Sequence, residues 1–463
     1  MMNAHLLKNT MVHPARVRFL NEQPVKKGAF VIYWMQQSQR VSYNHALNYA
    51  IVCANELRLP LVVFFCLSDG FPDANLRHYR FMLDGLAVTE RLLQDRGIRL
   101  IVQLGDPPHE IARFAKRAAL VVTDRGYLRI QQAWRAKAAV SLTCPLIQVE
   151  TDVIVPVEEA SAKEEYAAAT IRAKLHRRLA EFFTDHPTPD LKKKSLSIGG
   201  PSLNLADRER LCSRLRIDRS VPPVTWIKAG ETTAFEMLDR FINEKLDRFA
   251  DLRNDPAVEY LSNMSPYLHF GQISSFAIAK QVVGSGSRST EAFLEELFVR
   301  RELSMNFVYY NSHYDSITCL PAWSRRTLRE HLIDEREYRY TLHQLEQAET
   351  HDPCWNATQK EMVMRGKMHG YMRMYWGKKI LEWSRTPDAG YRTALLLNNK
   401  YSLDGRDPNG FAGIAWCFGK HDRPWGERAV FGQVRYMNDK GLRRKFDIDA
   451  YIARIEGEWR NST

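Results

Sequence analysis

The sequence predicts two domains of different classes: an α/β domain with a doubly wound parallel sheet, followed by a domain made of α-helices. In the first part of the chain, short β-branched apolar segments alternate with amphipathic helical segments. After a stretch rich in Pro, Gly and Ser, these apolar segments nearly disappear and helical patterns dominate. A chain of 463 residues also exceeds the size at which one hydrophobic core stops growing, so two cores are expected.

Five apolar segments are expected to be buried strands, because each is rich in Val, Ile, Leu or Phe without polar alternation. Helical segments lie between them, among them residues 44–57 and 78–97, and the second reaches Gly97, a typical residue at a helix end. This alternation indicates a parallel, Rossmann-like sheet. The expected strands are residues 29–35, 59–67, 99–105, 119–124 and 145–150.

The turn after the first expected strand lacks the glycine pattern of a dinucleotide site. Doubly wound sheets bind ligands at the carboxyl ends of their strands, often through a G-x-G-x-x-G turn. Here the strand is followed by QQSQR, residues 36–40. A standard dinucleotide site is therefore not expected in this domain, although its crevice remains open to another ligand.

Composition divides the chain into four segments. Residues 1–27 have weak periodicity and are expected to form a partly ordered leader, and residues 28–184 the α/β domain. Residues 185–230 are rich in Pro, Gly, Ser and Lys and are expected to be a linker. Residues 231–463 are expected to form the helical domain, which holds most of the ten tryptophans.

Charge and cysteine content limit the functions that the protein could have. A formal net charge of +12 favours a phosphate-rich partner, nucleic acid first, with simple solubility as the alternative. The seven cysteines show neither a C-x-x-C pair nor zinc-site spacing, which predicts reduced thiols and no metal site. No apolar run reaches the roughly 18 residues of a membrane span. We expect a soluble monomer of the cytoplasm, nucleoid or nucleus without a membrane partner.

The segment GYMRMYWGKKILEW, residues 370–383, combines oxidisable aromatic side chains with cationic ones. Trp376 and Trp383 are seven residues apart on one helix face, about 10.5 Å along the axis, and are too far apart to stack. A ring from another helix would fit between them, and Trp355 precedes this segment. The alternative is a core stripe, because most aromatic residues at three and four spacing only pack.

Polar residues precede a predicted helix in LSNMSPYLHFGQISS, residues 261–275. Pro266 disfavours a helical conformation for Ser265, so the polar stretch is expected to be extended or turning, with the helix beginning near Pro266 or Tyr267. Hydroxyl and backbone N–H groups there suit an anionic ligand such as a diphosphate, and an ordinary N-cap is the alternative.

Two further segments carry polar residues without a decisive pattern. Glu296 and Arg300 fall near one face of a predicted helix, where acidic residues are commonly solvated. Asp404, Asp407 and Asn409 crowd a turn-forming segment that lacks the spacing of a calcium-binding loop. Beyond it, basic residues outnumber acidic ones and alternate with aromatic residues, as in surfaces that bind a phosphate backbone and stack bases.

Together these motifs resemble the DNA photolyase and cryptochrome family, in particular the class II cyclobutane pyrimidine dimer photolyases. The resemblance covers about residues 28–455 and includes VIYWM and KEEYAAATIRAK in the first domain. It implies an α/β domain joined to a helical domain that binds FAD in a folded form. The motifs, in chain order, are LSNMSPYLHFGQIS, VRRELSMNF, THDPCWNATQ, KMHGYMRMYWGKKILEW, LDGRDPNGFAGIAW and HDRPWGER.

The resemblance implies a deoxyribodipyrimidine photo-lyase, a carbon–carbon lyase that acts on UV-damaged duplex DNA. Reduced anionic FAD absorbs blue light and donates an electron to a flipped-out pyrimidine dimer, which then splits. A deazaflavin-type antenna chromophore in the first domain is also implied for some members. The alternatives are a cryptochrome-like photoreceptor without repair activity, which often has a longer C-terminal extension, and a flavin-independent nucleic-acid-binding protein.

Cofactor contacts are implied residue by residue. The segment 262–265 would contact the FAD phosphates and ribityl chain, and Arg373 with Asp404 would form an ion pair over the flavin ring. Asn398, with Asn409 as a second candidate, would lie near flavin N5, where an amide cannot deliver a proton and so favours the anionic reduced state. The implied cofactor residues are Ser262, Asn263, Met264, Ser265, Arg373, Asp404, Arg406, Asp407 and Asn409.

Catalytic and DNA contacts follow from the same resemblance. Glu296 matches the carboxyl group that hydrogen-bonds the dimer and stabilises the arriving charge. Trp376, Trp355 and Trp383 match an electron-transfer chain, in the order nearest the flavin, bridging and at the surface. Met374 and Trp416 would pack on the dimer, and the implied DNA-binding residues are Arg253, Asn254, Arg300, Arg423 and Trp425.

Overall fold

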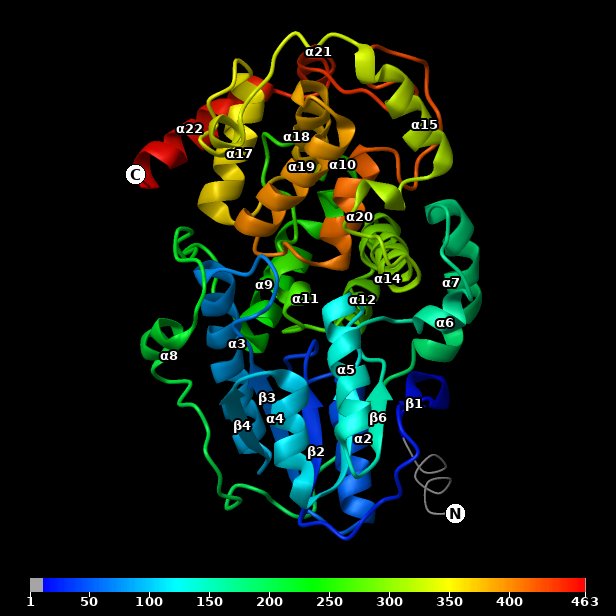
Figure 1. Ribbon diagram of the computed structural model, residues 1–463, viewed down its shortest axis with the longest axis vertical. Helices are drawn as coiled ribbons and strands as arrows, with labels where there is room; N and C mark the ends of the chain where they lie inside the picture. The colour runs from blue at the N-terminus through cyan, green and yellow to red at the C-terminus, as the bar shows by residue number, and fades with distance from the viewer. Residues whose placement is uncertain (1–10, 463) are drawn as a thin grey trace.

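The predicted α/β and helical domains lie at opposite ends of an elongated molecule (Figure 1). We describe the protein from a computed structural model, over residues 11–462. The sheet with its flanking helices forms one end, and the helices of the second half of the chain form the other. The fold class predicted from the sequence is confirmed.

The sheet contains the five predicted strands, all parallel, in the order β6-β5-β2-β3-β4. Val31 and Tyr33 of β2 pack in the core beneath α2 and α3, whereas Ile32 and Trp34 pack beneath α4 and α5. Helices thus cover both faces, which explains the continuous apolar runs. The elements are β2 (Phe30–Met35), α2 (His45–Glu56), β3 (Leu61–Leu67), α3 (Leu76–Asp95), β4 (Arg99–Leu104), α4 (Pro107–Phe114), η2 (Ala115–Arg117), β5 (Ala118–Asp124), α5 (Arg129–Ser141) and β6 (Leu146–Val149).

Part of the predicted leader, residues 1–27, belongs to the sheet. After η1 (Pro14–Arg16), strand β1 (Val17–Phe19) pairs antiparallel with β6 at the sheet edge. A half-buried strand of this length is too short to show a periodic pattern, so no sequence pattern indicates it. The leader prediction for residues 1–10 lies outside the described residues.

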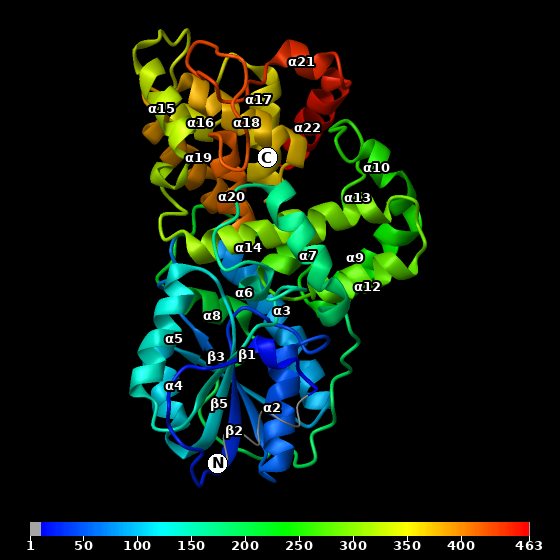
Figure 2. The same cartoon turned by 90° about the vertical axis from the view of Figure 1, so that its right-hand side faces the viewer.

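Two segments pack against other parts of the molecule than the predicted domain boundaries imply. Helices α6 (Val157–Ala160) and α7 (Ala168–Phe182) fall within predicted residues 28–184, yet they share a core with the helical half and lie beside it (Figure 2). The predicted linker, residues 185–230, contains α8 (Arg208–Arg214), which packs against α3. The linker therefore runs back over the α/β domain.

The helical half surrounds a core in which aromatic side chains are frequent. A π-helical segment, η4 (Glu295–Arg300), joins α13 to α14. Such segments are rare and often occur at functional sites. The elements are α9 (Glu231–Glu244), η3 (Leu246–Arg248), α10 (Phe249–Leu252), α11 (Ser265–His269), α12 (Ser275–Gly284), α13 (Thr290–Leu294), η4, α14 (Arg301–Tyr310), η5 (Ile317–Cys319), α15 (Ala322–Glu330), η6 (His331–Ile333), α16 (Leu342–Glu346), α17 (Pro353–Arg365), α18 (Gly370–Trp383), α19 (Pro387–Tyr401), α20 (Pro408–Cys417), α21 (Asp439–Arg443) and α22 (Ile448–Ser462).

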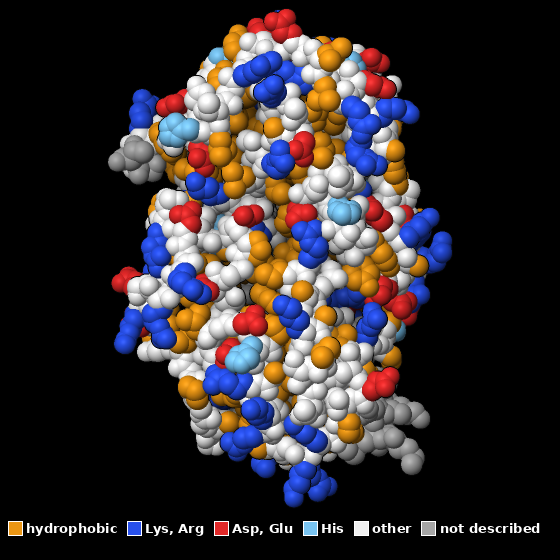
Figure 3. Space-filling model, viewed as in Figure 1, with side chains coloured by type: hydrophobic (Ala, Val, Ile, Leu, Met, Phe, Trp, Pro, Cys, Tyr) orange, Lys and Arg blue, Asp and Glu red, His pale blue; other side chains and the backbone are white. Residues whose placement is uncertain are grey.

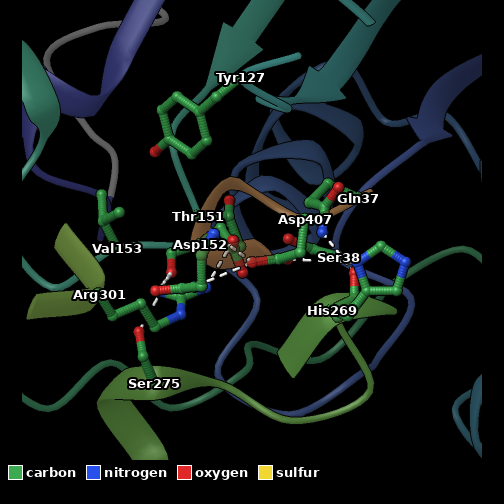
Figure 4. Close-up of polar contacts among 12 residues, drawn as sticks. Gln37, Ser38, Tyr127, Thr151, Asp152, Val153, His269, Ser275, Arg301 and Asp407 are labelled. Carbon is green, nitrogen blue, oxygen red and sulfur yellow. Dashed lines mark hydrogen bonds and ion pairs between the residues drawn. The ribbon is translucent and has the colours of Figure 1, made fainter. Parts of the chain in front are cut away.

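Buried charges join the two halves of the molecule (Figure 4). Arg301 of α14 contacts Asp152 of the segment after β6 at 2.7 Å, and both side chains are buried. The adjacent Glu302 accepts hydrogen bonds from the backbone N–H groups of Ile154 and Val155. Buried charges are tolerated only when they are paired, so this contact fixes how the two halves are oriented.

The backbones of the two halves also approach closely at Gly271. Its φ of +65° lies in the left-handed region, and an added Cβ would lie 1.8 Å from the carbonyl oxygen of Gln37. Only glycine fits such a contact.

No helix among residues 11–462 combines the length and apolar character needed to cross a membrane. Over the same residues, no group of His, Cys, Asp and Glu side chains has the arrangement of a metal site. The seven cysteines are buried and form no disulfide bond.

Candidate functional site

Two adjoining cavities lie in the helical half, where the predicted diphosphate segment meets the end of α17. Their empty volumes, which include space open to solvent, are about 410 Å³ and about 1240 Å³. Asn263, Arg365 and Trp226 line both cavities, and Ser262 lines the larger one. A cavity between helices is a typical place for a cofactor.

The segment 262–265 has the local geometry of a binding turn. Asn263 adopts a φ of +58°, a conformation that asparagine tolerates better than most residues. Its side-chain oxygen accepts a hydrogen bond of 2.7 Å from the ammonium of Lys367. Met264 is buried. The expectation that Ser265 lies outside the helix is wrong: Ser265 is the first residue of the short helix α11, because the first turn of a helix tolerates a proline such as Pro266.

The predicted ion pair is present. Arg373 Nη2 of α18 lies 3.4 Å from Asp404 Oδ1, although 31 residues separate them in the sequence. The Nε atom of Arg373 has no hydrogen-bond partner among the described residues. The same holds for the buried Nδ2 of Asn398, which lies close to Gly410 of α20: a Cβ added at Gly410 would be 3.2 Å from it, a tight contact.

The unpaired donors of Arg373 and Asn398 indicate whether the residues around α18 can bind FAD. A buried N–H without an acceptor costs about 1–3 kcal/mol, so native proteins rarely leave one unused. An isoalloxazine ring presents carbonyl oxygens and ring nitrogens as acceptors. The donors of Arg373 and Asn398 therefore fit the predicted cofactor.

Arg406 and Asp407 point toward the α/β domain. Arg406 donates to His78 of α3 at 2.8 Å and to the Asn399 carbonyl at 2.9 Å. Asp407 caps α20 through the Asn409 backbone N–H and lies 3.2 Å from His269. The Asn409 side chain also donates to Asp407. The predicted cofactor contacts of these three residues remain predictions, since their observed partners are protein groups at the domain junction.

A further cavity of about 750 Å³ lies in the α/β half at the carboxyl ends of β2 and β3. Trp34, Cys66 and Trp134 line it from the sheet side, and His269 and Arg406 close it from the helical side. It is the crevice of the doubly wound sheet, for which the sequence excluded a standard dinucleotide but not another ligand.

The three predicted tryptophans form a continuous row. Trp355 and Trp376 lie with ring centroids 6.4 Å apart and planes 6° from parallel. Trp383 contacts Trp355 edge to face, with centroids 5.5 Å apart. Trp376 is one helical turn from Arg373 on α18, so the row begins next to the candidate cofactor donors. Its indole N–H donates to the Gln359 side-chain oxygen at 2.9 Å.

One part of this prediction is wrong: Trp383 is not at the surface. Only 4% of it is exposed, because Tyr340 and His351 pack against its ring, with centroids 5.1 Å and 5.5 Å away. The covering residues come from a segment before α17, and nothing in the sequence around Trp383 indicates that contact.

Glu296 is exposed and paired with cations. It forms an ion pair with Arg253 and a second one with Arg300, whose Nε lies 3.2 Å away. The side chain is 42% exposed on the π-helical segment η4. The structure thus brings together three residues predicted for the dimer and its DNA, with exposed Asn254 next to Arg253 in sequence.

A second predicted group lies beyond α20. The guanidinium of Arg435 stands 5.8 Å from the ring centroid of Trp416 and 5.0 Å from that of Trp425. Arg423 lies 5.3 Å from the Trp425 ring, which is 41% exposed. The thiol of Cys417, next to Trp416, lies 3.9 Å from the Met374 carbonyl oxygen. Cation–π contacts therefore link the predicted residues into one surface.

Basic residues are distributed widely over the surface. Figure 3 shows Lys and Arg side chains over both halves on one face, with hydrophobic side chains visible between them. On this face the positive charge does not form a single patch.

Comparison with known proteins gives the family. Residues 31–192 match the sequence family described as DNA photolyase. A deoxyribodipyrimidine photo-lyase of Methanothermobacter thermautotrophicus is 54% identical over 449 residues, which cover 96% of this chain and 99% of that protein. This chain belongs to the DNA photolyase and cryptochrome family. The photo-lyase of Arabidopsis thaliana is 40% identical over 96% of this chain and 93% of its own length.

Solved photolyase structures have the same fold. The archaeal photolyase from Sulfolobus tokodaii, described with two FAD molecules, superposes with a TM-score of 0.70 at 17% identity, over 92% of this chain and 89% of that chain. The predictions of the photolyase and cryptochrome family and of a deoxyribodipyrimidine photo-lyase are therefore confirmed, as is the α/β plus helical architecture.

Sequence reasoning missed two residues of this photolyase. Gln359 lies four residues after Trp355, on the same helix face, so helical spacing was a signal that could have identified it as a neighbour of the indoles. Arg435 contributed to the basic run, but no local pattern distinguishes it from its neighbours.

Proposed function

We propose that the protein is a class II photolyase that uses blue light to repair cyclobutane pyrimidine dimers in DNA, with reduced anionic FAD as cofactor. The observation that carries the proposal is the row of buried indoles that begins beside Arg373. The names of the relatives at 40% and 54% identity support the reaction. The order of the motifs supports the class II assignment.

The cofactor residues would bind and orient FAD in the helical half. When bound and reduced, FAD supplies an electron on absorbing blue light. Asn398 offers an N–H donor that cannot release a proton near neutral pH, which favours the anionic form of the reduced ring. Arg373, held by Asp404, supplies positive charge close by.

The DNA residues would receive a flipped-out dimer and fill the space that it leaves. Glu296, oriented by Arg253 and Arg300, is placed to hydrogen-bond the dimer in a fixed geometry. Trp416 packs on the dimer, and exposed Trp425 replaces it in the duplex. The partner is duplex DNA that carries a pyrimidine dimer, bound by a monomer.

The cavity at the sheet is proposed to hold an antenna chromophore of the deazaflavin type. Its aromatic lining, from Trp34 and Trp134, suits a planar ring system, and Arg406 and Gln37 offer hydrogen-bond donors at its edge.

One experiment tests the proposal. The full-length protein is purified, its visible spectrum is recorded, and it is illuminated with blue light, under reducing conditions, with an oligonucleotide that carries one thymine dimer. We expect a flavin spectrum and light-dependent return of intact thymines, with a dark sample as control. Bound flavin without repair would instead identify a cryptochrome-like photoreceptor. A protein without flavin would contradict both functions.

A further inference from the structure

A half-buried lysine lies at the candidate cofactor cavity. Lys367 lies in the turn between α17 and α18 and lines the 410 Å³ cavity together with Asn263. Its side chain is accessible only in part, and burial lowers the pKa of its ammonium group to about 8. The hydrogen bond that the structure gives this ammonium goes to the neutral side-chain oxygen of Asn263.

The nearby carboxylates have other partners. Asp404 pairs with Arg373. Glu361 accepts hydrogen bonds from the Tyr451 hydroxyl at 2.8 Å and from a backbone N–H. An ammonium group has three donors, so Lys367 retains donors for a ligand in the cavity.

The other cations of this cavity are already neutralised. Arg365 forms ion pairs with Glu259 and Glu458, and Arg454 pairs with the same two carboxylates. Among the described residues that line the cavity, Lys367 differs because no carboxylate lies within ion-pair distance of it. A cation removed from bulk water without an anionic partner is an electrostatic site for an anion.

We propose that Lys367 is the counter-ion of the FAD diphosphate, so that retention of the cofactor depends on its positive charge. This inference rests on the proposed function. The segment 262–265 offers hydroxyl, amide and backbone N–H groups, which are neutral donors, whereas a diphosphate carries negative charge. The ammonium of Lys367 donates a hydrogen bond to Asn263 of that segment, so it lies beside these neutral donors. It supplies the positive charge that the neutral donors lack.

The test compares two substitutions in the full-length protein with bound FAD. Lys367→Met keeps an unbranched side chain of nearly the same length and removes its charge, whereas Lys367→Arg keeps the charge. Flavin content after purification, the FAD dissociation rate, the thermal midpoint and the flavin midpoint potential are measured for each. Lys360→Met is the matched control, because Lys360 pairs with Glu456 between α17 and α22.

We expect Lys367→Met to release FAD about 10- to 100-fold faster, the range for loss of a charge-assisted hydrogen bond. Lys367→Arg recovers most of the retention, and Lys360→Met behaves like the wild type. The midpoint potential of the remaining FAD stays unchanged, because the diphosphate does not change charge on reduction.

Other outcomes overturn the inference. Equal retention of FAD in Lys367→Met and the wild type would show that the charge is not used. A shifted midpoint potential with normal retention would place Lys367 at the flavin ring instead of the diphosphate. A wild-type protein that binds no flavin would contradict the proposed function itself, whereas the first two results leave it standing.

Discussion

The indoles of Trp355 and Trp376 are held nearly parallel by two different helices, with the Trp355 N–H donating to the Trp376 backbone carbonyl at 3.1 Å. Both rings are fully buried. Their relative position is therefore fixed by the packing of α17 against α18. Rings fixed in contact within a water-free core suit rapid electron transfer, because little surrounding polarity has to rearrange.

Replacing Trp376 with Phe should block light-driven reduction of oxidised FAD and spare dimer repair when a chemical reductant is supplied. The change removes the indole nearest the candidate cofactor donors but no predicted contact to DNA. Absorbance of oxidised flavin during illumination measures the first effect, and repair of a dimer-containing oligonucleotide the second. Trp323→Phe is the control, since Trp323 lies outside the row of indoles and donates a hydrogen bond to the hydroxyl of exposed Tyr166. Loss of repair together with photoreduction would contradict the assigned role.

Replacing Glu296 with Ala should lower the number of dimers repaired per absorbed photon about tenfold or more, as for other preorganised contacts to developing charge. Affinity for damaged DNA should not fall, because the change removes only the ion pairs that Glu296 forms with Arg253 and Arg300 and leaves both cations in place. Quantum yield and equilibrium binding are measured separately. Glu296→Gln, which retains hydrogen bonding without the charge, should fall between Ala and wild type. A variant with normal yield would exclude a role for Glu296 at the dimer.

Replacing Arg435 with Gln should weaken DNA binding and reduce the slope of log Kd against log salt concentration by about one, as expected for one lost phosphate contact. Arg435 stands between the rings of Trp416 and Trp425, where a bound duplex would approach. Fluorescence anisotropy at several salt concentrations measures both values. Arg392→Gln is a suitable control, since Arg392 is an exposed arginine paired with Asp388 on α19. An unchanged salt slope would remove Arg435 from the DNA interface.

The protein should lose stability as the pH falls from about 6.5 toward 4. The pKa of His186 and that of His369 are both lowered to about 4, chiefly by burial, and the neighbouring Lys367 contributes to the lowered value of His369. Both are neutral in the folded protein, so their contribution is complete above the unfolded-state pKa and is lost as the unfolded chain takes up protons. At pH 5 the loss is roughly 2 kcal/mol per histidine in the free energy of unfolding.

His369→Asn separates this effect from other acid effects. The His369 ring accepts the Tyr371 backbone N–H at the start of α18, and an Asn side chain also serves as an N-cap. Denaturant unfolding at pH 7 and pH 5 should therefore show a smaller decline for the variant than for the wild type. An equal decline in both proteins would mean that His369 is already protonated in the fold.

The sequence predicted the elements that have strong local patterns. Strands β2 to β6 are continuous apolar runs, and the helical half has clear periodicity, so both were found. Strand β1 was missed because only its pairing with β6 makes it a strand. In the site, the ion pair of Arg373 with Asp404 was predicted from motifs, whereas the burial of Trp383 depends on residues brought from elsewhere by tertiary folding.

The loop between α19 and α20 faces both halves of the molecule: Asp404 meets Arg373 in the helical half, and two residues later Arg406 meets His78 of α3. Removing the α/β half would remove His78 from Arg406 and Asp152 from the buried guanidinium of Arg301. The helical half is therefore not a detachable module, and a minimal photolyase would have to retain the sheet even if no light were ever harvested there.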